Sequence, residues 1–537
     1  MVDEVKFTNK VENFYIEKKE VAKLEKSSYD ELFQIIELFI DKHNIGRHNS
    51  NLIRSIATLE GLISGKVCKE YWLKIFGKKA KILHDEGWIY IHNLSRLGPY
   101  CTGFSARDLA EKGFNSLAAN NLNTRPPKHL DSLINQISNL IFTISQEVHG
   151  ATAVNDFTTI VASYLFILEK YFNEKIDDKK LQNLMESFIY TVNIPLRAGG
   201  NSPFSNITME FSKPDPRLKE EIVIYGGKEV WIDGEKIVLK DKNFFNMGNL
   251  KPLKYKDIPS EYFDRVNIAF IEAMAKGDGK GKPFTFPLIT VNITDDFDFN
   301  NKAFQLLLEK MDSWGGCYFE NFRKEPFHLK KFKEKNPFIQ ERDSEAQRSM
   351  CCRLQLNLEE IVKLGGGNAF RQNSGVGSVG VININLNRIL WLSKGDFEKI
   401  KEMLSYLIEN AVIFLNKKRE WILKNKDLFP YFIYYNKNLD TYFNSISTIG
   451  LHEGLINIDY ENGIFNEEGR DFAHKIYQWI YNYLNELMKK YKVPINHEFA
   501  PSENAGPTLA KKDIIFARLI TKKGKDATQD EFLKKFI

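Results

Sequence analysis

Two adjacent cysteines, Cys351 and Cys352, are the residues of this chain whose chemistry most needs an explanation. The chain has 537 residues and five cysteines, and the other three (Cys68, Cys101 and Cys317) lie far apart in the sequence. Neighbouring thiols can bind zinc, close a strained disulfide, fill space as small apolar side chains, or react. Zinc sites commonly use two Cys-x-x-Cys pairs, which this chain lacks, so we expect no metal site. A vicinal disulfide is rarer still, which leaves burial of both thiols and reactivity of one as the main alternatives.

Three glycines follow the cysteine pair in the segment NSGVGSVGVININ, namely Gly375, Gly377 and Gly380. Their Gly-x-Gly-x-x-Gly spacing is typical of dinucleotide-binding loops, which follow a strand and open a helix. Here the glycines precede a predicted strand, so we reject dinucleotide binding. Glycines let the backbone approach another backbone or a ligand closely, and this favours the reactive thiol.

The composition indicates a large globular protein. Hydrophobic residues make up 43% of the chain, enough to bury a substantial core. The net charge of +5 is too small to indicate binding to nucleic acid or to a membrane surface. The N-terminal residues contain no apolar signal-peptide core, and the chain has no run of about 18 apolar residues. With an odd number of cysteines, which fits a reducing compartment, these features predict a cytoplasmic protein without a membrane span.

The hydrophobic pattern predicts different elements along the chain. Residues 11–70 and 129–190 carry helical spacing. Residues 213–260 contain short β-rich runs separated by Gly-Gly and Asp-Gly turns, which indicates an inserted β-rich region at the surface. From residue 285 onward, short apolar strands alternate with long helical patterns, and this alternation is typical of an α/β layer or barrel.

Six stretches occur in one order along the chain: WIYIHNLSRLGPYCTGFSARDLAEKGF (88–114), SQEVHGATAVNDF (145–157), NIPLRAGGNSPFSNITMEF (193–211), GKPFTFPLITVNITDDFDF (281–299), CCRLQLN with GSVGVININLNRI (351–389), and FNSISTIGLHEGLIN (443–457). Together they resemble the anaerobic, class III ribonucleoside-triphosphate reductases, which are glycyl-radical oxidoreductases of deoxyribonucleotide synthesis. The resemblance runs from about residue 45 to about residue 520.

The resemblance implies a ten-stranded α/β barrel, made of two antiparallel five-strand halves, with a radical cysteine on a loop inside the barrel. We expect a largely helical N-terminal region over residues 1–80, without an ATP-cone, and the catalytic barrel over 81–537. The β-rich insertion at 213–260 belongs to the barrel part. The family's C-terminal zinc and glycyl-radical segment is expected to be absent.

The resemblance assigns roles to three of the cysteines. The family motif has its radical cysteine directly before an arginine, and Cys352 precedes Arg353. Cys352 is therefore the predicted thiyl radical that removes the 3′-hydrogen of the ribose, and Cys351 is its packing neighbour. Cys101, in GPYCTGF, is the predicted second cysteine, which supplies a hydrogen atom from the opposite face of the sugar as water leaves C2′.

The resemblance also implies the substrate-binding residues. Backbone amides and small hydroxyls approach phosphate and ribose closely, as the sequence GGNSPFSN would allow, although the same residues suit an ordinary turn. A histidine in IYIHNL stands where the family has one near the substrate, although a lone histidine is as often a core residue. The predicted substrate-binding residues are His92, Gly200, Asn201, Ser202, Ser205 and Asn206.

Two further catalytic candidates concern the source of electrons. Formate-using members carry an asparagine two residues before the glycine that corresponds to Gly380, and Ser378 stands there instead. Other members use a glutamate near the C-terminal end with a thioredoxin-like donor, and Glu503 lies in such a Pro-x-Glu motif. The serine argues against formate and the glutamate for a thioredoxin-like reductant, but the sequence leaves both reductants open. The alternative for Glu503 is a solvated loop carboxylate.

The family carries its stable radical on a glycine in an Arg-x-x-Gly-Tyr loop, and Gly524, the last glycine, has no such frame. We therefore expect no cofactor bound in this chain and a glycyl radical supplied by a separate chain. An activase with S-adenosylmethionine and an iron-sulfur cluster would generate that radical. Ribonucleoside triphosphates, nucleotide effectors and a second copy of the chain in a homodimer are the other expected partners.

Two alternatives remain open. One is a nucleotide-binding paralogue that keeps the barrel without the chemistry. The other is a different glycyl-radical enzyme, such as a relative of pyruvate formate-lyase, which also uses two adjacent cysteines.

Overall fold

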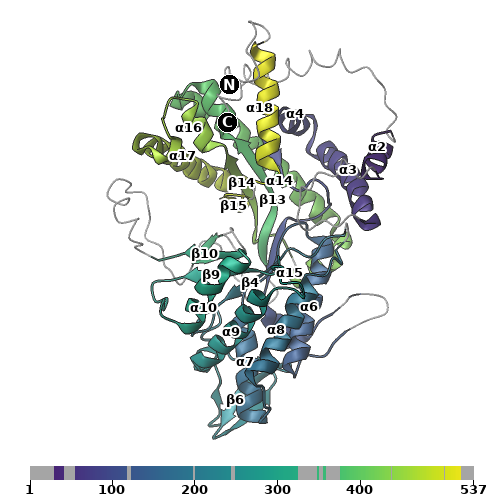
Figure 1. Ribbon diagram of the computed structural model, residues 1–537, viewed down its shortest axis with the longest axis vertical. Coiled ribbons are helices and arrows are strands. Elements are labelled where there is room, and N and C mark those ends of the chain that lie inside the picture. The colour runs from purple at the N-terminus through teal and green to yellow at the C-terminus, as the bar shows by residue number, and fades with distance from the viewer. Residues whose placement is uncertain are drawn as a thin grey trace. The chain divides into compact units, whose positions relative to one another are not determined.

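The structure is a computed structural model, and its chain divides into two compact units (Figure 1). Unit 1 comprises Met1–Tyr100, Ser378–Asn425 and Tyr442–Ile537, and unit 2 comprises Cys101–Gly377 and Lys426–Thr441. The structure describes residues 30–40, 55–115, 117, 123–197, 200–242, 248–323, 347–349, 355–357, 375–436, 438–500 and 502–521.

Unit 2 contains five parallel strands that are paired in chain order. Parallel neighbours cannot be joined by a hairpin, so each connection must cross over, and helices fill most of the crossovers here. The strands are β2 (Cys101–Phe104), β3 (Thr152–Val154), β4 (Ser205–Met209), β9 (Leu288–Ile293) and β10 (Cys317–Asn321).

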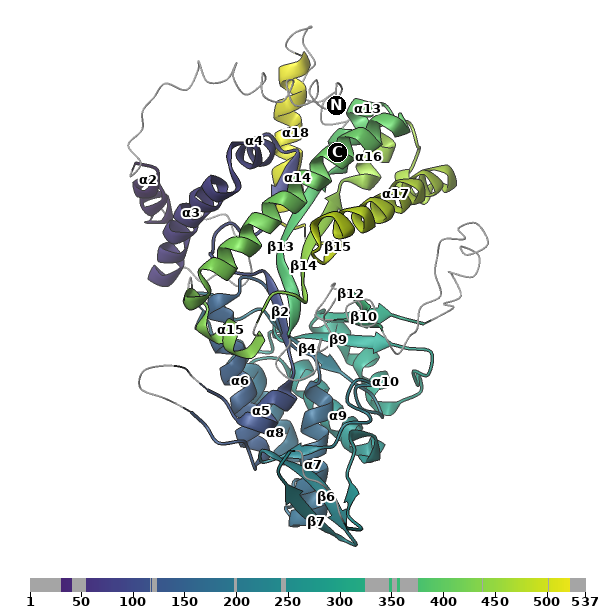
Figure 2. The same ribbon diagram turned by 180° about the vertical axis from the view of Figure 1, so that it is seen from behind.

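The helices of unit 2 pack against one another, and Figures 1 and 2 show α7, α8 and α9 side by side. Phe157, Phe188 and Phe270, one from each of these helices, form an aromatic cluster with ring centroids 5.3 to 6.4 Å apart. Such a cluster fixes how the helices cross. The helices are α5 (Ala106–Lys112), α6 (Leu130–Glu147), α7 (Phe157–Phe172), α8 (Asp178–Val192), α9 (Ser260–Lys276), α10 (Lys302–Lys310) and α15 (Pro430–Asn436).

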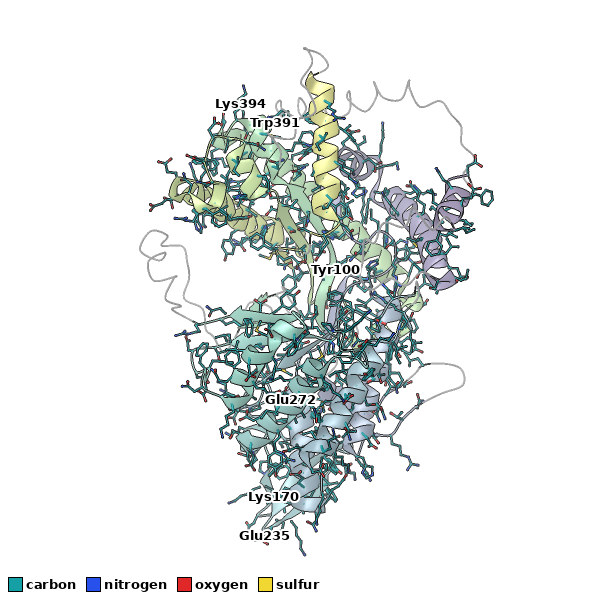
Figure 3. The ribbon with its side chains drawn as sticks, in the orientation of Figure 1. Tyr100, Lys170, Glu235, Glu272, Trp391 and Lys394 are labelled. Atoms are coloured by element: carbon teal, nitrogen blue, oxygen red, sulfur yellow. The ribbon has the colours of Figure 1, made fainter. Side chains whose placement is uncertain are left out.

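A second sheet of unit 2 has four antiparallel strands: β5 (Ile224–Tyr225), β6 (Lys228–Asp233), β7 (Lys236–Lys240) and β8 (Lys251–Pro252). A tight turn joins β6 to β7, and Gly234 supplies the positive φ of 59° that this turn needs. Glu235 lies at the tip of the turn (Figure 3). Two short strands, β11 (Gln347–Ser349) and β12 (Gln355–Asn357), form a separate antiparallel pair.

Unit 1 has a smaller sheet with helices from three parts of the sequence. In this sheet β1 (Ile89–Ile91) is antiparallel to β13 (Val376–Asn385), β14 (Tyr442–Ile449) lies next to β13, and β15 (Ile495–His497) is parallel to β14. The helices are α2 (Asp30–Ile40), α3 (Ile56–Phe76), α4 (Lys78–Glu86), α13 (Leu386–Ser393), α14 (Phe397–Lys424), α16 (Leu451–Ile456), α17 (Glu467–Tyr491) and α18 (Ala505–Thr521).

The core of unit 1 lies between its sheet and these helices. Ile89 and Ile91 of β1 pair with Ile384 and Ile382 of β13, and all four side chains are buried in this core. Trp72 of α3 is fully buried against α14, with its ring 4.9 Å from that of Trp421.

Short 3-10 turns, at Tyr255–Asp257, Met311–Ser313, Lys426–Leu428 and Gly463–Phe465, complete the described elements of both units.

The predicted α/β class and the helical N-terminal region are confirmed, and unit 2 contains a five-stranded parallel sheet of the kind expected for one half of the barrel. A total of ten strands stays a prediction. The helical pattern over residues 129–190 is interrupted, because the short strand β3 separates α6 from α7.

We expect Gly113→Ala to destabilise the protein more than Gly234→Ala. Both glycines have positive φ, which costs a side chain about 1–2 kcal/mol. A Cβ at Gly113 would also lie 2.5 Å from the carbonyl oxygen of Thr124, whereas a Cβ at Gly234 would meet open space. The backbone shift that relieves such a clash adds about 1–3 kcal/mol. Thermal unfolding of both variants measures the difference, and equal shifts in Tm would contradict the predicted close packing at Gly113.

Candidate functional site

One face of the five-stranded sheet of unit 2 carries several buried polar side chains, and the other face is mostly apolar. Residues paired in register on parallel strands point to the same side, so Asn206 shares its side with Gly103, Ala153 and Leu288. Parallel sheets usually carry apolar side chains on both faces, so a buried polar face indicates a binding site. The polar face comprises Cys101, Asn206, Thr208, Thr290, Asn292 and Glu320, all of them buried.

The opposite face carries the packing. Val154, Ile207, Ile289, Met209 and Val291 alternate with the polar set along their strands, and all five are at most 1% exposed. The helices α6 and α7 contact β3 and β4. The apolar face therefore provides the packing against the helices, and the side chains of the polar face are not needed for it.

Cys101 is the first residue of β2 and its thiol is shielded. The side chain is 5% exposed, and its sulfur accepts a hydrogen bond from the backbone N–H of Ala151, 3.2 Å away. Asn206 lies two strands away on the same face, in register with Gly103, so that strand spacing and the two-residue offset together separate it from Cys101 by about 12 Å. A ribose fits within that span. The structure therefore brings two of the sequence-predicted site residues to one face.

The loop before β4 contains the other predicted substrate residues. Gly200 has a positive φ of 69°, and its N–H donates to the carbonyl of Arg197 at 3.0 Å. The hydroxyl of Ser202 donates to the carbonyl of Asn193 at 2.6 Å, and the backbone carbonyl of Asn201 accepts from Arg197 N–H. These bonds hold the loop at the N-terminal end of β4.

Arg197 anchors this loop to the end of α6. Its guanidinium is buried and donates to the carbonyls of Ser145, at 3.0 Å, and of Val148 and His149. A guanidinium that satisfies three carbonyls at a helix end is rigid, because each bond constrains the planar group. Arg197 therefore ties the start of this loop firmly to the end of α6.

Ser205 and Asn206 point to opposite sides of β4. Ser205 pairs with Thr152 and lies on the apolar side, whereas Asn206 donates to the hydroxyl of Thr290 at 3.0 Å on the polar face. The hydroxyls of Ser205 and Thr152 are buried without a hydrogen-bond partner among the described residues. Of these two predicted substrate residues, only Asn206 shares a face with Cys101.

Three predicted site residues belong to unit 1. His92 follows β1, with its ring 4.9 Å from that of Tyr90. Ser378 is buried on β13, where its hydroxyl lies 2.9 Å from that of Ser445 and donates to the carbonyl of Gly380 at 3.1 Å. The backbone N–H of Tyr100, labelled in Figure 3, donates to the carbonyl of Ser378 at 2.9 Å. Glu503 is exposed just before α18.

Sequence reasoning missed Asn383, which lies on β13 opposite Tyr90. It is completely buried, and neither its Oδ1 nor its Nδ2 has a hydrogen-bond partner among the described residues. A buried amide without partners is costly, so such groups are kept where a ligand or water completes them. The signal was the Asn-Ile-Asn alternation in GVININ, which puts Asn383 on the face of the strand opposite Ile382 and Ile384.

Four members of the polar face were also missed: Thr208, Thr290, Asn292 and Glu320. Their signal is a polar residue at every second position of a buried strand, as in LITVNI. Because its apolar residues dominate, the sequence predicts this run as an apolar strand. A period of two hidden inside an apolar run was the available clue.

Asp156 lies at the carboxyl end of β3 and is completely buried. Burial raises the pKa of this carboxyl, while hydrogen bonds from the Ser105 hydroxyl and from the Ala106 N–H, the latter at 2.7 Å, counteract the rise. These two bonds join the ends of β2 and β3 at the start of α5. Arg217, paired with Asp215 at 2.8 and 3.0 Å, adds a favourable charge nearby.

Glu147, at the end of α6, anchors α15. Its carboxylate accepts from the backbone N–H groups of Tyr431, at 3.1 Å, and Phe432, at 2.7 Å, in the first turn of that helix. Burial raises the pKa of Glu147 to about 7, although the two N–H groups lower it. Glu147 therefore changes charge near neutral pH.

Cys351, Cys352, Arg353 and Gly524 lie outside the described residues. Among the described residues, no group of three or more His, Cys, Asp or Glu side chains is arranged to hold a metal ion. The helices of the described ranges include none that is long and apolar enough to cross a membrane.

The comparison with protein families decides what this chain is related to. A family model described as anaerobic ribonucleoside-triphosphate reductase matches residues 48–526, which is most of the chain. The chain belongs to this family. The family's activity makes the protein an oxidoreductase that acts on ribonucleoside triphosphates, and the earlier resemblance is confirmed.

Solved structures of anaerobic ribonucleotide reductases share the fold. One from Thermotoga maritima, with citrate in the active site, is 19% identical with a TM-score of 0.62 over 90% of this chain and 82% of that one. Another from the same organism, in complex with dATP and CTP, is 18% identical with a TM-score of 0.62 over 90% and 76%. A third, described as anaerobic ribonucleotide reductase, is 20% identical with a TM-score of 0.63 over 90% and 71%. No curated protein matches the chain significantly.

We expect Glu147→Gln to remove a pH dependence of stability. Because the pKa of Glu147 rises from 4.5 to about 7 on folding, the native state binds the proton more tightly, and stability falls as pH rises between these values. The glutamine variant should match the wild type in Tm near pH 5 and exceed it near pH 8. The matched control is Glu235→Gln, at an exposed carboxyl of the same unit. A constant Tm difference at all pH values would contradict the raised pKa.

Proposed function

We propose that this chain reduces ribonucleoside triphosphates by thiyl-radical chemistry. A thiyl radical on Cys352 removes the 3′-hydrogen, the 2′-hydroxyl leaves as water, and Cys101 supplies hydrogen to C2′. The 3′-hydrogen then returns from Cys352 to the sugar. The net change replaces one hydroxyl by hydrogen, so two electrons and two protons must come from a reductant. The observation that carries this proposal is Cys101, a buried thiol on a polar face with Asn206.

The surroundings of Cys101 suit this role. Burial keeps water and oxygen from the sulfur, and the Ala151 N–H fixes its position. A hydrogen atom can be transferred only over a short distance, so a thiol donor must be preorganised against the sugar. Residues of unit 2 provide that preorganisation through the pairing of β2 with β3.

Substrate binding is assigned to the loop before β4 and to the polar face. The loop, tied to α6 by Arg197, presents Gly200, Asn201 and Ser202 at the N-terminal end of the strand. Small side chains and backbone N–H groups there suit a phosphate or a ribose hydroxyl. Asn206 and Thr290, with donor and acceptor atoms on the polar face, suit the sugar. His92 remains a proposed contact, whereas the Ser205 side chain lies on the opposite face of β4 from Asn206.

The electrons are proposed to come from a thioredoxin-like dithiol rather than from formate. Ser378 occupies the position at which formate-using members have an asparagine, and its buried hydroxyl is engaged with Ser445 and Gly380. Glu503 is exposed, so it can exchange protons with solvent or with a docked reductant. We assign it the proton transfer that accompanies reoxidation of the dithiol.

The glycyl radical is proposed to come from a polypeptide outside these 537 residues. None of the 33 glycines stands before a tyrosine, so the Arg-x-x-Gly-Tyr frame is not found among them. An activase with S-adenosylmethionine and an iron-sulfur cluster would act on that polypeptide, and no other cofactor is required in this chain. A homodimer with nucleotide effectors, in the cytoplasm, completes the proposal. The Thermotoga maritima reductase binds dATP in a specificity site.

Substitution of the cysteines tests the radical chemistry. Cys352→Ala and Cys101→Ala should abolish turnover with little change in nucleotide affinity, because the thiols are needed for hydrogen transfer and add little to binding. Cys351→Ala is the matched control and should keep activity at a cost of about 1 kcal/mol in stability. Anaerobic turnover and equilibrium nucleotide binding are the measurements. Loss of activity in Cys351→Ala with unchanged stability would instead support a two-cysteine relay.

Electron paramagnetic resonance tests where the stable radical resides. After anaerobic treatment with a radical S-adenosylmethionine activase, these 537 residues alone should show no glycyl doublet and no turnover. Addition of a polypeptide with the Arg-x-x-Gly-Tyr frame should restore both. A doublet from this chain that disappears in Gly524→Ala would place the radical here and overturn the separate-polypeptide proposal.

A further inference from the structure

Helix α18, yellow in Figure 1, is held by a buried ion pair within unit 1. The side chains of Arg388, on α13, and Asp513, in the middle of α18, are 1% and 7% exposed. The guanidinium Nε and Nη2 both lie 2.7 Å from Asp513 Oδ1. Its Nη1 donates to the carbonyl of Glu86 at the end of α4, at 2.6 Å. One arginine thus joins three helices that are far apart in the sequence.

The Asp513 carboxylate receives two further donors from the same segment. Asn385 Nδ2 donates to Oδ1 at 2.9 Å, and Asn387 Nδ2 donates to Oδ2 at 3.2 Å. Asn387 is itself held by Asn457, whose Nδ2 donates to its Oδ1 at 2.8 Å. The carboxylate is therefore satisfied on both oxygens, as a buried charge requires.

Two aromatic rings cover the guanidinium. It lies 5.0 Å from the ring centroid of Trp88 and 4.4 Å from that of Phe516, which is one turn beyond Asp513 on α18. These contacts exclude water from the pair and add cation–π attraction. Because successive helix positions differ by about 100°, rotation of α18 by one residue would move the carboxylate away from all its donors. The ion pair therefore fixes both the position and the rotation of α18.

The segment before α18 is fixed at its other end. The N–H of Glu498 donates to the carbonyl of Ile446 at 2.9 Å, and the N–H of Ala500 donates to the hydroxyl of Ser447 at 3.1 Å. Glu503 lies between these bonds and the first turn of α18. Its carboxylate is exposed and makes no hydrogen bond or ion pair within the described part of the chain. The position of Glu503 therefore depends on how its backbone is held, by the hydrogen bond of Ala500 before it and by α18 after it.

We propose that Arg388 and Asp513 are positioning residues for Glu503. The buried pair holds α18 in one orientation, and α18 with the Ala500 anchor holds the Glu503 segment where a reductant can reach it. About 12 Å of helix separates Ala505 from Asp513, so neither residue of the pair touches the reacting groups. This inference rests on the role proposed for Glu503.

Hydrogen exchange tests the ion pair independently of catalysis. Asp513→Asn keeps the shape of the side chain but leaves the buried guanidinium without its counter-charge. Amide exchange over residues 505–521 should become faster by about 100-fold, because breaking a buried pair on one side strongly destabilises it. Lys511→Gln, an exposed site on the same helix, should leave exchange unchanged and is the matched control. Unchanged exchange in Asp513→Asn would overturn the proposal.

A milder variant keeps the test useful if Asp513→Asn does not fold. Asn387→Ala removes one donor to the carboxylate and leaves the ion pair in place. Exchange over α18 should then accelerate by about tenfold, between the wild type and the loss of the whole pair. Exchange in Asn387→Ala that equals the wild type would also contradict the proposal.

A double-mutant cycle links the pair to Glu503. In the complete reductase with its activase and radical source, Asp513→Asn should lower kcat with the thioredoxin-like donor and leave the KM for the nucleotide unchanged. In the Glu503→Gln background the same substitution should have no further effect, because its action passes through Glu503. Additive losses would overturn the proposal. If Glu503→Gln alone has full activity, the proposed role of Glu503 fails, while the exchange result still reports on the ion pair.

Discussion

The register of the five parallel strands in unit 2 is the constraint on which the candidate site depends. Side chains alternate along a strand with a period of two, so a shift of one residue would exchange the apolar and polar faces. The apolar side, with Val154, Ile207 and Ile289, specifies the register because the helices cover it. The same register then places the polar residues Cys101 and Asn206 together on the other face. Packing on one face thus positions the chemistry on the other.

In unit 2, ionisable side chains also fix loops and helix ends outside the strands. Arg197 joins the loop before β4 to the end of α6, and Asp156 joins the ends of β2 and β3 to the start of α5. Glu147 does the same for α15. Each is a buried or half-buried ionisable group that satisfies backbone groups left open at a helix end or in a loop. Their shared role is to hold irregular backbone rigidly beside the sheet.

In unit 1, a buried ion pair holds separate helices together. Its helices come from three separate parts of the sequence, and local propensity cannot bring α4, α13 and α18 together. Arg388, on α13, brings them together by donating to the Asp513 carboxylate on α18 and to the carbonyl of Glu86 at the end of α4. A buried ion pair adds little net stability, but its geometry is demanding and tolerates few alternative arrangements. Such a pair is therefore suited to hold α18 in one specific position.

The amino-acid sequence by itself determined the α/β class, the long helices and the family, because amphipathic periodicity and ordered motifs are local or linear properties. One of the long helical patterns predicted after residue 285 corresponds to α14, at Phe397–Lys424. The strand β3 was missed, because three residues between two helical patterns carry too little periodicity. Only the tertiary structure decided that Cys101 and Asn206 share a face while Ser205 points away, and that Thr290, Asn292 and Glu320 join them. Those relations depend on pairing between strands that are distant in the sequence, and the register of such pairing is set by packing that no single segment contains.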